Sequence, residues 1–333
     1  MSTRRQVVLA IGAGALAAPL ALLAQQPAPG THRIGFLAPR SRSTASRPDV
    51  YYDAFVQGMR DRGYVEGKNL VIEWRFAEGK YERMPDMAAD LVSMKVEVIV
   101  VDGTPAVRAA QNATRAIPIV AAIVADPVGS GFAASLGRPG GNITGLSSIS
   151  VELISKEFEL LKAVLPRLSR VAVFTNPGAS QHVNLLKNLQ AVARQFGVAI
   201  VPVSARSTEE IERGFATVKR ERAEAVILAA EPFFTGQMHQ IAALATKHRL
   251  ASVYTVSPGY AKAGGLISYG ADNLEYFHRA AGLVDKIFRG AKPSELPFEQ
   301  PTKIHLAINR KTAKAIGITI PQELLLRADE VIE

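Results

Sequence analysis

Hydrophobic and polar positions along the chain alternate between two patterns. Short apolar runs such as 33–38 and 98–101 have the composition of buried strands. Between these runs, apolar residues recur three and four positions apart, as in the helix that carries Tyr52 and Met59 and stops near Gly63. Strands that alternate with helices form parallel sheets through right-handed crossovers. The pattern therefore predicts an α/β fold with doubly wound parallel sheets.

The same order of elements occurs twice, which predicts two similar lobes. The segment GYVEGKNLVIEW before VEVIVVDGTPA has a counterpart in RQFGVAIVPVSA before AEAVILAAEPF. The Gly-rich segment 140–146 is expected to be the first crossing between the lobes, and 266–270 to be a strand that returns to the first lobe. The expected boundaries are 32–146 plus 266–302 for the N-terminal lobe and 147–265 plus 303–333 for the C-terminal lobe.

Five predicted strands end in similar corners of small, polar and proline residues. At the carboxyl ends of parallel strands, where open α/β sheets bind ligands, these corners would meet. Helix starts there offer unpaired N–H groups, which favour carboxylates. A single strand-to-helix turn can contain capping residues and proline for structural reasons alone. One such corner is therefore no evidence of a ligand site, whereas the five corners together indicate one. The corners are Asp102-Gly103-Thr104-Pro105, Asp126-Pro127, Asn176-Pro177-Gly178, Glu231-Pro232 and Ser257-Pro258-Gly259.

The N-terminus has the pattern of an export signal. Arg4-Arg5 precedes eighteen uncharged residues, Val7 to Ala24, and a polar linker follows at 25–31. Cleavage is expected near Ala24, giving a periplasmic protein, and the paired arginines are compatible with the twin-arginine route. The alternative is an uncleaved membrane anchor, because the run is just long enough to span a bilayer.

The amino-acid composition excludes several classes of function. The chain has 333 residues, 48% of them hydrophobic, which suffices for two globular domains. Its formal charge of +9 falls to +7 without Arg4 and Arg5 and is spread along the chain, so no nucleic-acid partner is expected. The absence of Cys excludes disulfides, thiolate metal sites and cysteine nucleophiles.

A series of segments, in order along nearly the whole mature chain, resembles the ABC-transporter substrate-binding family that includes tryptophan- and tyrosine-type binding proteins. The segments are EGKNLVIEWRFAEG, TPA, IPIV, ADPVGSGF, RPGGNITGLS, ELLKAVLP, NPG, YAKAGGLISYG and INRKTAKAIGITIP. The resemblance implies a type I periplasmic binding fold with three crossing segments and a ligand held between closing lobes. It also implies a monomeric, non-enzymatic protein, without cofactor, that delivers its ligand to an ABC permease.

The resemblance places four residues at the ligand. Thr104 corresponds to the Thr-Pro corner of the family, Asp126 to its Asp-Pro corner, Ser147 to the first crossing and Asn176 to the Asn-Pro-Gly corner. At the fourth strand of the second lobe, where the family's amino-acid binders have an Asp-Asn pair, this chain has Ala230-Glu231-Pro232. Glu231 could meet an ammonium group, but the departure weakens the case for an amino-acid ligand.

Other side chains near the corners are also candidates for the site. Arg40 and Arg42, in a loop after the first strand, could clamp a carboxylate and favour an organic acid, although a solvated polar loop explains them equally well. Tyr254, Phe234 and Ser257 are candidates for the wall of the cleft. Replacing Tyr254 or Phe234 by Ala is expected to weaken binding more than stability.

Enzymatic and signalling functions are the alternatives. The first is an exported α/β enzyme with Asp126 or Glu231 as general base on a carboxylate substrate, and the second is a ligand-sensing module for a membrane signalling protein. No metal site is expected, because the histidines lack metal-ligand spacing. Phosphate-loop, Gly-x-Ser-x-Gly and His-Glu-x-x-His motifs are absent outside the signal.

Overall fold

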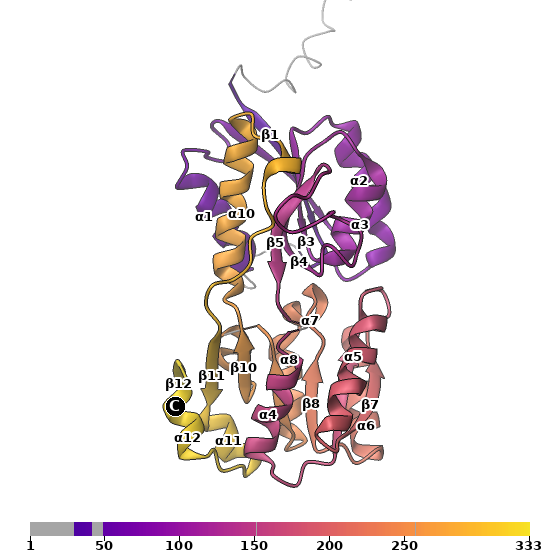
Figure 1. Ribbon diagram of the computed structural model, residues 1–333, viewed down its shortest axis with the longest axis vertical. Coiled ribbons are helices and arrows are strands. Elements are labelled where there is room, and N and C mark those ends of the chain that lie inside the picture. Colours follow the sequence, from indigo (N-terminus) through magenta and orange to yellow (C-terminus); the bar gives the residue numbers. More distant parts are fainter. Residues whose placement is uncertain (1–29, 42–48, 151, 257) are drawn as a thin grey trace, which may run out of the picture.

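The computed structural model describes residues 30–41, 49–150, 152–256 and 258–333. Two α/β lobes lie one above the other along the long axis of the molecule (Figure 1). The expected signal segment 1–24, most of the linker 25–31, Arg42 and Ser257 fall outside the described residues.

The first lobe is built on a five-stranded parallel sheet with the order β2-β1-β3-β4-β5. Of its central strands, β3 is buried along its whole length and β4 along most of it, as the continuous apolar runs predict. Its elements are β1 (His32–Ala38), α1 (Val50–Arg60), β2 (Leu70–Phe76), the 3₁₀ helix η1 (Tyr81–Arg83), α2 (Met84–Ser93), β3 (Val98–Asp102), α3 (Thr104–Ala113), β4 (Ile119–Ala125), β5 (Ile143–Ser148), α10 (Asn273–Phe288) and the 3₁₀ helix η2 (Pro293–Glu295).

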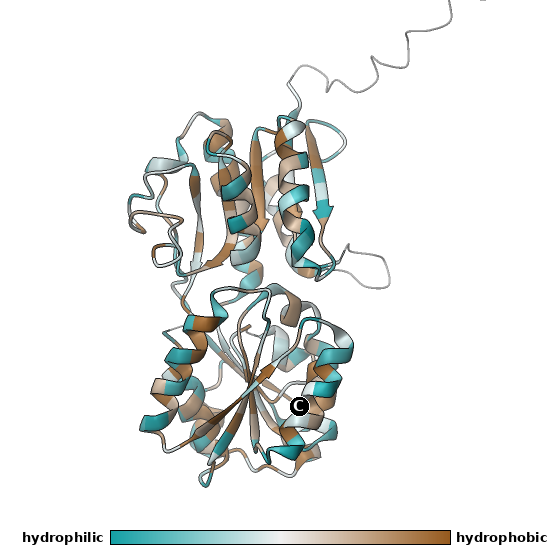
Figure 2. Ribbon diagram, turned by 90° about the vertical axis from the view of Figure 1, so that its right-hand side faces the viewer, coloured by the Kyte–Doolittle hydropathy of each residue, from teal (hydrophilic) through white to brown (hydrophobic). Residues whose placement is uncertain are grey.

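The second lobe has a seven-stranded sheet with the order β12-β11-β10-β9-β8-β6-β7, in which only the β10–β11 pair is antiparallel. In Figure 2 its strands are mostly hydrophobic and the outward helix faces hydrophilic. Its elements are α4 (Ile154–Val164), β6 (Arg170–Thr175), α5 (His182–Gln195), β7 (Ala199–Ser204), α6 (Thr208–Arg220), β8 (Ala225–Leu228), α7 (Pro232–Gly236), α8 (Met238–Lys247), β9 (Ala251–Tyr254), α9 (Gly259–Lys262), β10 (Ile267–Gly270), β11 (His305–Asn309), α11 (Arg310–Ile316), α12 (Gln322–Arg327) and β12 (Glu330–Ile332).

Two expected lobe boundaries are wrong. The strand at 266–270 belongs to the second sheet, where Ile267 lies opposite Val253 and Ile308 in the core. A hydrophobic run identifies a strand but not the sheet that it joins, and only the following helix, α10, returns to the first lobe and packs on α1. The first crossing also comes later than 140–146, because Ser147 and Ser148 complete β5.

Three segments cross between the lobes, as the family resemblance implies. They join β5 to α4, β10 to α10, and η2 to β11. The last of them runs beside the end of β5, where Ser147 and Glu299 share a backbone hydrogen bond of 2.8 Å. One buried apolar cluster contains residues of both lobes, including Tyr51, Phe55, Phe233 and Tyr254, so the lobes are in contact.

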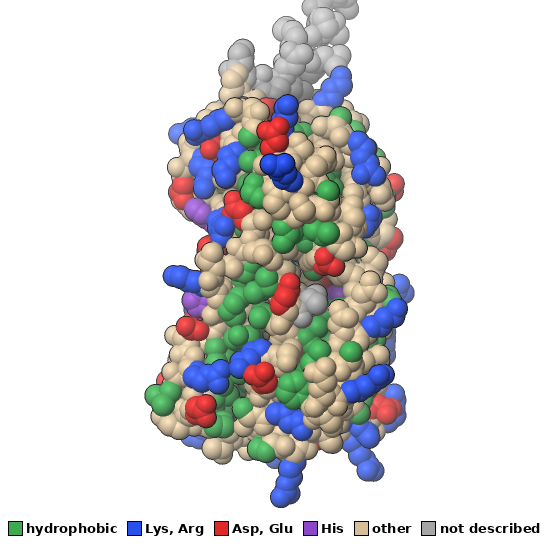
Figure 3. Space-filling model, in the orientation of Figure 1, with side chains coloured by type: hydrophobic (Ala, Val, Ile, Leu, Met, Phe, Trp, Pro, Cys, Tyr) green, Lys and Arg blue, Asp and Glu red, His purple; other side chains and the backbone are tan. Residues whose placement is uncertain are grey.

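Charged side chains are distributed over both lobes. On the face drawn in Figure 3, Lys and Arg are scattered among acidic residues, and hydrophobic side chains gather along the middle of the molecule, where the lobes meet. The overall positive charge therefore does not form a single basic patch on this face.

Candidate functional site

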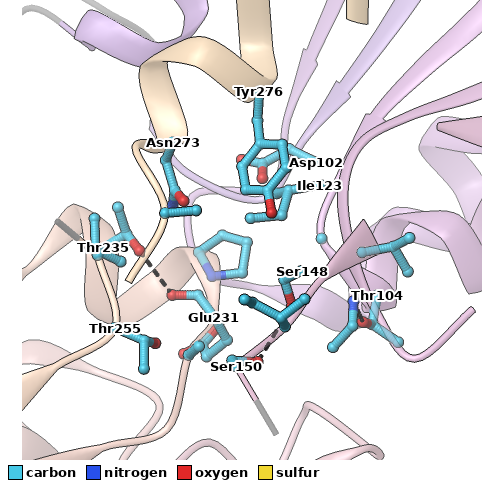
Figure 4. A pocket seen from close by; sticks show the side chains of 18 of the residues that line it. Asp102, Thr104, Ile123, Ser148, Ser150, Glu231, Thr235, Thr255, Asn273 and Tyr276 are labelled. Carbon is cyan, nitrogen blue, oxygen red and sulfur yellow. Dashed lines mark hydrogen bonds between the residues drawn. The ribbon is translucent and has the colours of Figure 1, made fainter. Parts of the chain in front are cut away.

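A pocket lies between the lobes where the carboxyl ends of the two sheets face each other. Its lining comes from the ends of β3, β4 and β5 in the first lobe, β8 and β9 in the second, and the start of α10 (Figure 4). Two of the five expected corners, Asp102-Gly103-Thr104-Pro105 and Glu231-Pro232, meet at this pocket. The lining residues are Arg40, Asp102, Gly103, Thr104, Ile123, Val124, Ala125, Ser148, Ile149, Ser150, Leu153, Gln181, Ala230, Glu231, Pro232, Thr235, Thr255, Val256, Ala271, Asn273, Tyr276 and Phe277.

On the first-lobe side, the pocket has a buried cluster of charged groups. Arg40 follows β1, and its Nε and Nη2 donate to Asp49 at 2.7 and 3.2 Å. Its Nη1 contacts Asp102 Oδ2 at 2.8 Å, and Tyr52 donates to the same oxygen at 3.2 Å. The guanidinium also lies over the rings of Tyr51 and Tyr52, 5.1 and 4.5 Å from their centroids. All three guanidinium nitrogens thus contact carboxylates of the protein.

Asp102 is the acid at the end of β3, and one of its oxygens has no partner. The residue is fully buried, yet Oδ1 accepts no hydrogen bond from the described residues. Burial raises the pKa of this carboxyl to about 6, against the opposing effect of Arg40. A buried acceptor without a donor costs about 1–3 kcal/mol, so the pocket favours a guest that donates to Oδ1.

On the second-lobe side, Glu231 forms the N-cap of α7. Its carboxylate accepts from the backbone N–H groups of Phe233 at 2.9 Å and Phe234 at 3.3 Å. The Asn176 amide donates to it at 3.2 Å, and the Tyr81 hydroxyl of the first lobe donates across the cleft. Burial raises the pKa of Glu231 to about 7, although these hydrogen bonds act in the opposite direction.

Because its pKa is raised on folding, Glu231 should make stability depend on pH. The native state then binds the proton more tightly than the unfolded chain. The contribution of Glu231 to the free energy of unfolding is fully present at low pH and is lost as pH rises through about 7. We expect the melting temperature of wild type minus that of Glu231→Gln to fall between about pH 5 and pH 8. Glu209→Gln, an exposed control whose pKa is lowered, should not show this fall. If the difference in melting temperature between wild type and Glu231→Gln stayed constant with pH, the pKa of Glu231 would not be raised on folding.

The family model described as "ABC transporter substrate binding protein" matches residues 46–332, which is most of the chain. The chain belongs to that family. The resemblance noted in the sequence is thereby confirmed, and the two-lobed architecture is the type I periplasmic binding fold.

Similar proteins are found among characterised relatives and solved structures. The chain is 24% identical to a tyrosine-binding protein of Clostridioides difficile over 264 residues, covering 79% of this chain and 75% of the relative. A conserved domain protein from Vibrio cholerae has a TM-score of 0.81 and 27% identity, covering 90% of this chain and 99% of that one. An ABC domain from Streptococcus pneumonia, solved in complex with L-Trp, has a TM-score of 0.80 and 24% identity over 91% and 100% of the two chains.

The structure of this substrate-binding protein brings three of the predicted site residues into the pocket. Arg40, Thr104 and Glu231 line it directly. Asp126 and Ser147 line a neighbouring cavity in the cleft, where exposed Asp126 caps its own turn by accepting from Gly129 N–H at 2.8 Å. Arg42 and Ser257 lie outside the described residues.

Three other predicted residues lie behind the pocket surface. Asn176 is 1% exposed and reaches Glu231 from the β6 corner. Tyr254 is fully buried, and its hydroxyl lies 2.9 Å from Thr235 Oγ1 and 3.1 Å from the Glu231 carbonyl. Phe234 is also fully buried, packed on Phe233. The expectation that Tyr254 and Phe234 form the wall of the cleft was therefore wrong, because both contribute to the core.

Several residues that line the pocket were not predicted from the sequence. Asp102 stands in a predicted corner, of which only Thr104 was expected at the ligand. Asn273 and Tyr276 come from α10, whose return to the first lobe was predicted without a role at the site. Four side-chain hydroxyls were also not predicted: Ser148 and Ser150 at the end of β5, Thr255 after β9, and Thr235 in α7 (Figure 4).

Two further features bear on function. Among the residues that the structure describes, no helix has the length and apolar character needed to cross a bilayer. Within the same ranges, no group of three or more His, Cys, Asp or Glu is placed to hold a metal ion.

Proposed function

We propose that this protein is the extracytoplasmic binding component of an ABC importer and closes its lobes around a small α-amino acid with an aromatic side chain. The observation that carries the choice of ligand is the partnerless Oδ1 of Asp102 in a pocket enclosed by both lobes. An ammonium group provides three donors and a positive charge, which suits a buried carboxylate acceptor.

The charges around the pocket support an ammonium group over a second carboxylate. Arg40 is held by Asp49 and Asp102, so its charge is already balanced within the protein. Glu231 adds a further acidic group on the opposite wall. A free organic acid would bring more negative charge to this set, whereas a zwitterion supplies the missing cation. Arg40 therefore gives little support to an organic acid.

Donors for the ligand carboxylate are present on another side of the pocket. The α3 helix begins at Thr104, and the first turn of a helix has backbone N–H groups without partners in the helix. Ser148 and Ser150 add hydroxyls at the end of β5, 3.2 Å from each other. An α-carboxylate bound by these donors would lie close to Asp102, because Asp102 and Thr104 belong to the same corner.

Apolar side chains provide room for the rest of the ligand. Ile123 on β4, Val256 just after β9, and Tyr276 and Phe277 on α10 line the pocket. Relatives support an aromatic amino acid, since one is named a tyrosine-binding protein and another was solved with L-Trp. A binding role is further supported by Glu231, whose carboxylate already accepts four hydrogen bonds and is poorly placed to act as a general base.

The proposal includes export with removal of the N-terminal signal, delivery to a permease of the inner membrane, and a monomeric state. Family membership supports the first two, since members are typically extracytoplasmic partners of ABC permeases. Mass spectrometry of the exported protein would test cleavage near Ala24, and light scattering would test the monomer.

Asp102→Asn should weaken amino-acid binding by about tenfold or more, because hydrogen bonds to charged groups are worth about 1.5–3 kcal/mol. The matched control is Asp49→Asn, which also removes a carboxylate partner of Arg40 but does not line this pocket. Calorimetric titration of refolded, ligand-stripped protein with L-tyrosine and L-tryptophan would measure both. Equal losses in the two variants would mean that Asp102 acts only by holding Arg40.

A further inference from the structure

A small second cavity adjoins the central pocket inside the second lobe. It lies between α4, α5 and the ends of β8 and β9, and it shares Ser150, Ala230 and Thr255 with the central pocket. In Figure 4, Ser150 and Thr255 lie on the second-lobe side of the pocket. Most of the cavity wall is apolar, formed by the almost fully buried side chains of Ile154, Leu189, Ile227 and Leu228 and by half-buried Leu185.

Two polar atoms in this apolar wall have no partner among the described residues. One is Oε1 of Glu157, a residue of α4 that is 3% exposed, and the other is Oγ1 of Thr255, which is 9% exposed. Most buried polar groups in proteins are hydrogen-bonded, and one left without a partner costs stability. No cation among the described residues explains the position of Glu157, and burial alone raises the pKa of its carboxyl well above the usual range. A neutral carboxylic acid can both donate and accept a hydrogen bond.

We infer that Glu157 and Thr255 form a distal subsite that receives a neutral hydrogen-bonding group at the tip of the ligand side chain. The inference rests on the proposed amino-acid function, because the α-ammonium and α-carboxylate groups must occupy the central pocket for the side chain to point this way. A phenol hydroxyl or a ring N–H has the required chemistry, whereas a bare phenyl ring would leave both protein groups without partners. The subsite would then select among aromatic amino acids by the group at the end of the ring.

The test compares L-tyrosine with L-phenylalanine, which differ only in the hydroxyl. Ligand-stripped wild-type protein should bind L-tyrosine at least about tenfold more tightly than L-phenylalanine, equivalent to ~1.4 kcal/mol. Glu157→Leu and Thr255→Val should each reduce that preference, chiefly by weakening L-tyrosine binding. Thr255→Val preserves side-chain shape and keeps the test available if Glu157→Leu folds poorly. The control is Glu159→Leu on the same helix, where the exposed carboxylate pairs with Lys156 at 2.5 Å and the preference should not change.

The outcomes separate this inference from the proposed function. Equal binding of L-tyrosine and L-phenylalanine by wild type, or a preference that survives in both subsite variants, would overturn the subsite and leave amino-acid binding intact. Tighter binding of L-lysine than of L-tyrosine would also overturn it, because the tip group would then be a cation. Failure of all the amino acids to bind would remove the proposed function and the subsite with it.

Discussion

Gly103→Ala should lower ligand affinity by at least about 100-fold, the largest effect expected for any single methyl group in this protein. Gly103 joins β3 to α3, and a Cβ atom there would lie 2.6 Å from Cγ of Pro232 on the opposite lobe. Since both atoms belong to relatively rigid corners, the lobes would have to separate to relieve the contact. Calorimetry with L-tyrosine on folded variant protein would measure the loss.

A control is needed because Gly103 also has a φ of +84°, which disfavours any other residue. Gly63, also in the first lobe, has a φ of +88°, and a Cβ there would meet nothing within 4 Å. Gly63→Ala should therefore lose stability through backbone strain while keeping its affinity. If Gly103→Ala retained wild-type affinity, the close approach of the two corners would not be part of the ligand-bound state.

Tyr81→Phe should weaken ligand binding by about ten- to a hundredfold, mainly through faster dissociation. The Tyr81 hydroxyl of the first lobe donates to Glu231 in the second and accepts from the Phe233 N–H at 3.3 Å. The Tyr81–Glu231 hydrogen bond can form only when the lobes are together. Its loss should therefore destabilise the closed form and leave the stability of each lobe unchanged. Stopped-flow measurement of ligand release, together with melting of the ligand-free protein, would show whether the effect is on closure.

Tyr64→Phe is the matched control for Tyr81. Its hydroxyl also donates to a carboxylate, Asp285 at 3.0 Å, but both residues belong to the first lobe. Removing it should leave the release rate near that of wild type. Equal acceleration of release by the two substitutions would indicate a general loosening of the protein and no specific contact between the lobes.

The parts of the fold that could be predicted from sequence depend on local patterns. Strand runs and helix spacing identified most elements because burial on both faces of a parallel strand leaves a continuous apolar segment. The convergence of the corners followed from the direction of parallel strands. The sheet membership of 266–270 did not follow, because an apolar strand can pair in either lobe and only the tertiary partners Val253 and Ile308 decide it.

The site was harder to predict because its chemistry depends on contacts between distant residues. Arg40 was one candidate clamp for a ligand carboxylate, but Asp49 and Asp102 neutralise it, and the contact with Asp102 joins the segment after β1 to the end of β3. Phe234 was expected at the surface of the cleft, but the sequence does not show whether an aromatic residue beside a corner points into the cleft or into the core. Tyr81 has no recognisable motif, and its role becomes visible only when the two lobes are brought together.

In the proposed function, the two lobes enclose one unmodified α-amino acid. Calorimetric titration of refolded residues 25–333 with L-tyrosine and with 3-(4-hydroxyphenyl)propionate, which lacks the ammonium group, followed by recovery of the ligand, would test this. We predict one L-tyrosine bound per chain and recovered unchanged, with the deaminated acid binding at least about tenfold more weakly. Tighter binding of the deaminated acid, or chemical conversion of the amino acid, would contradict the account.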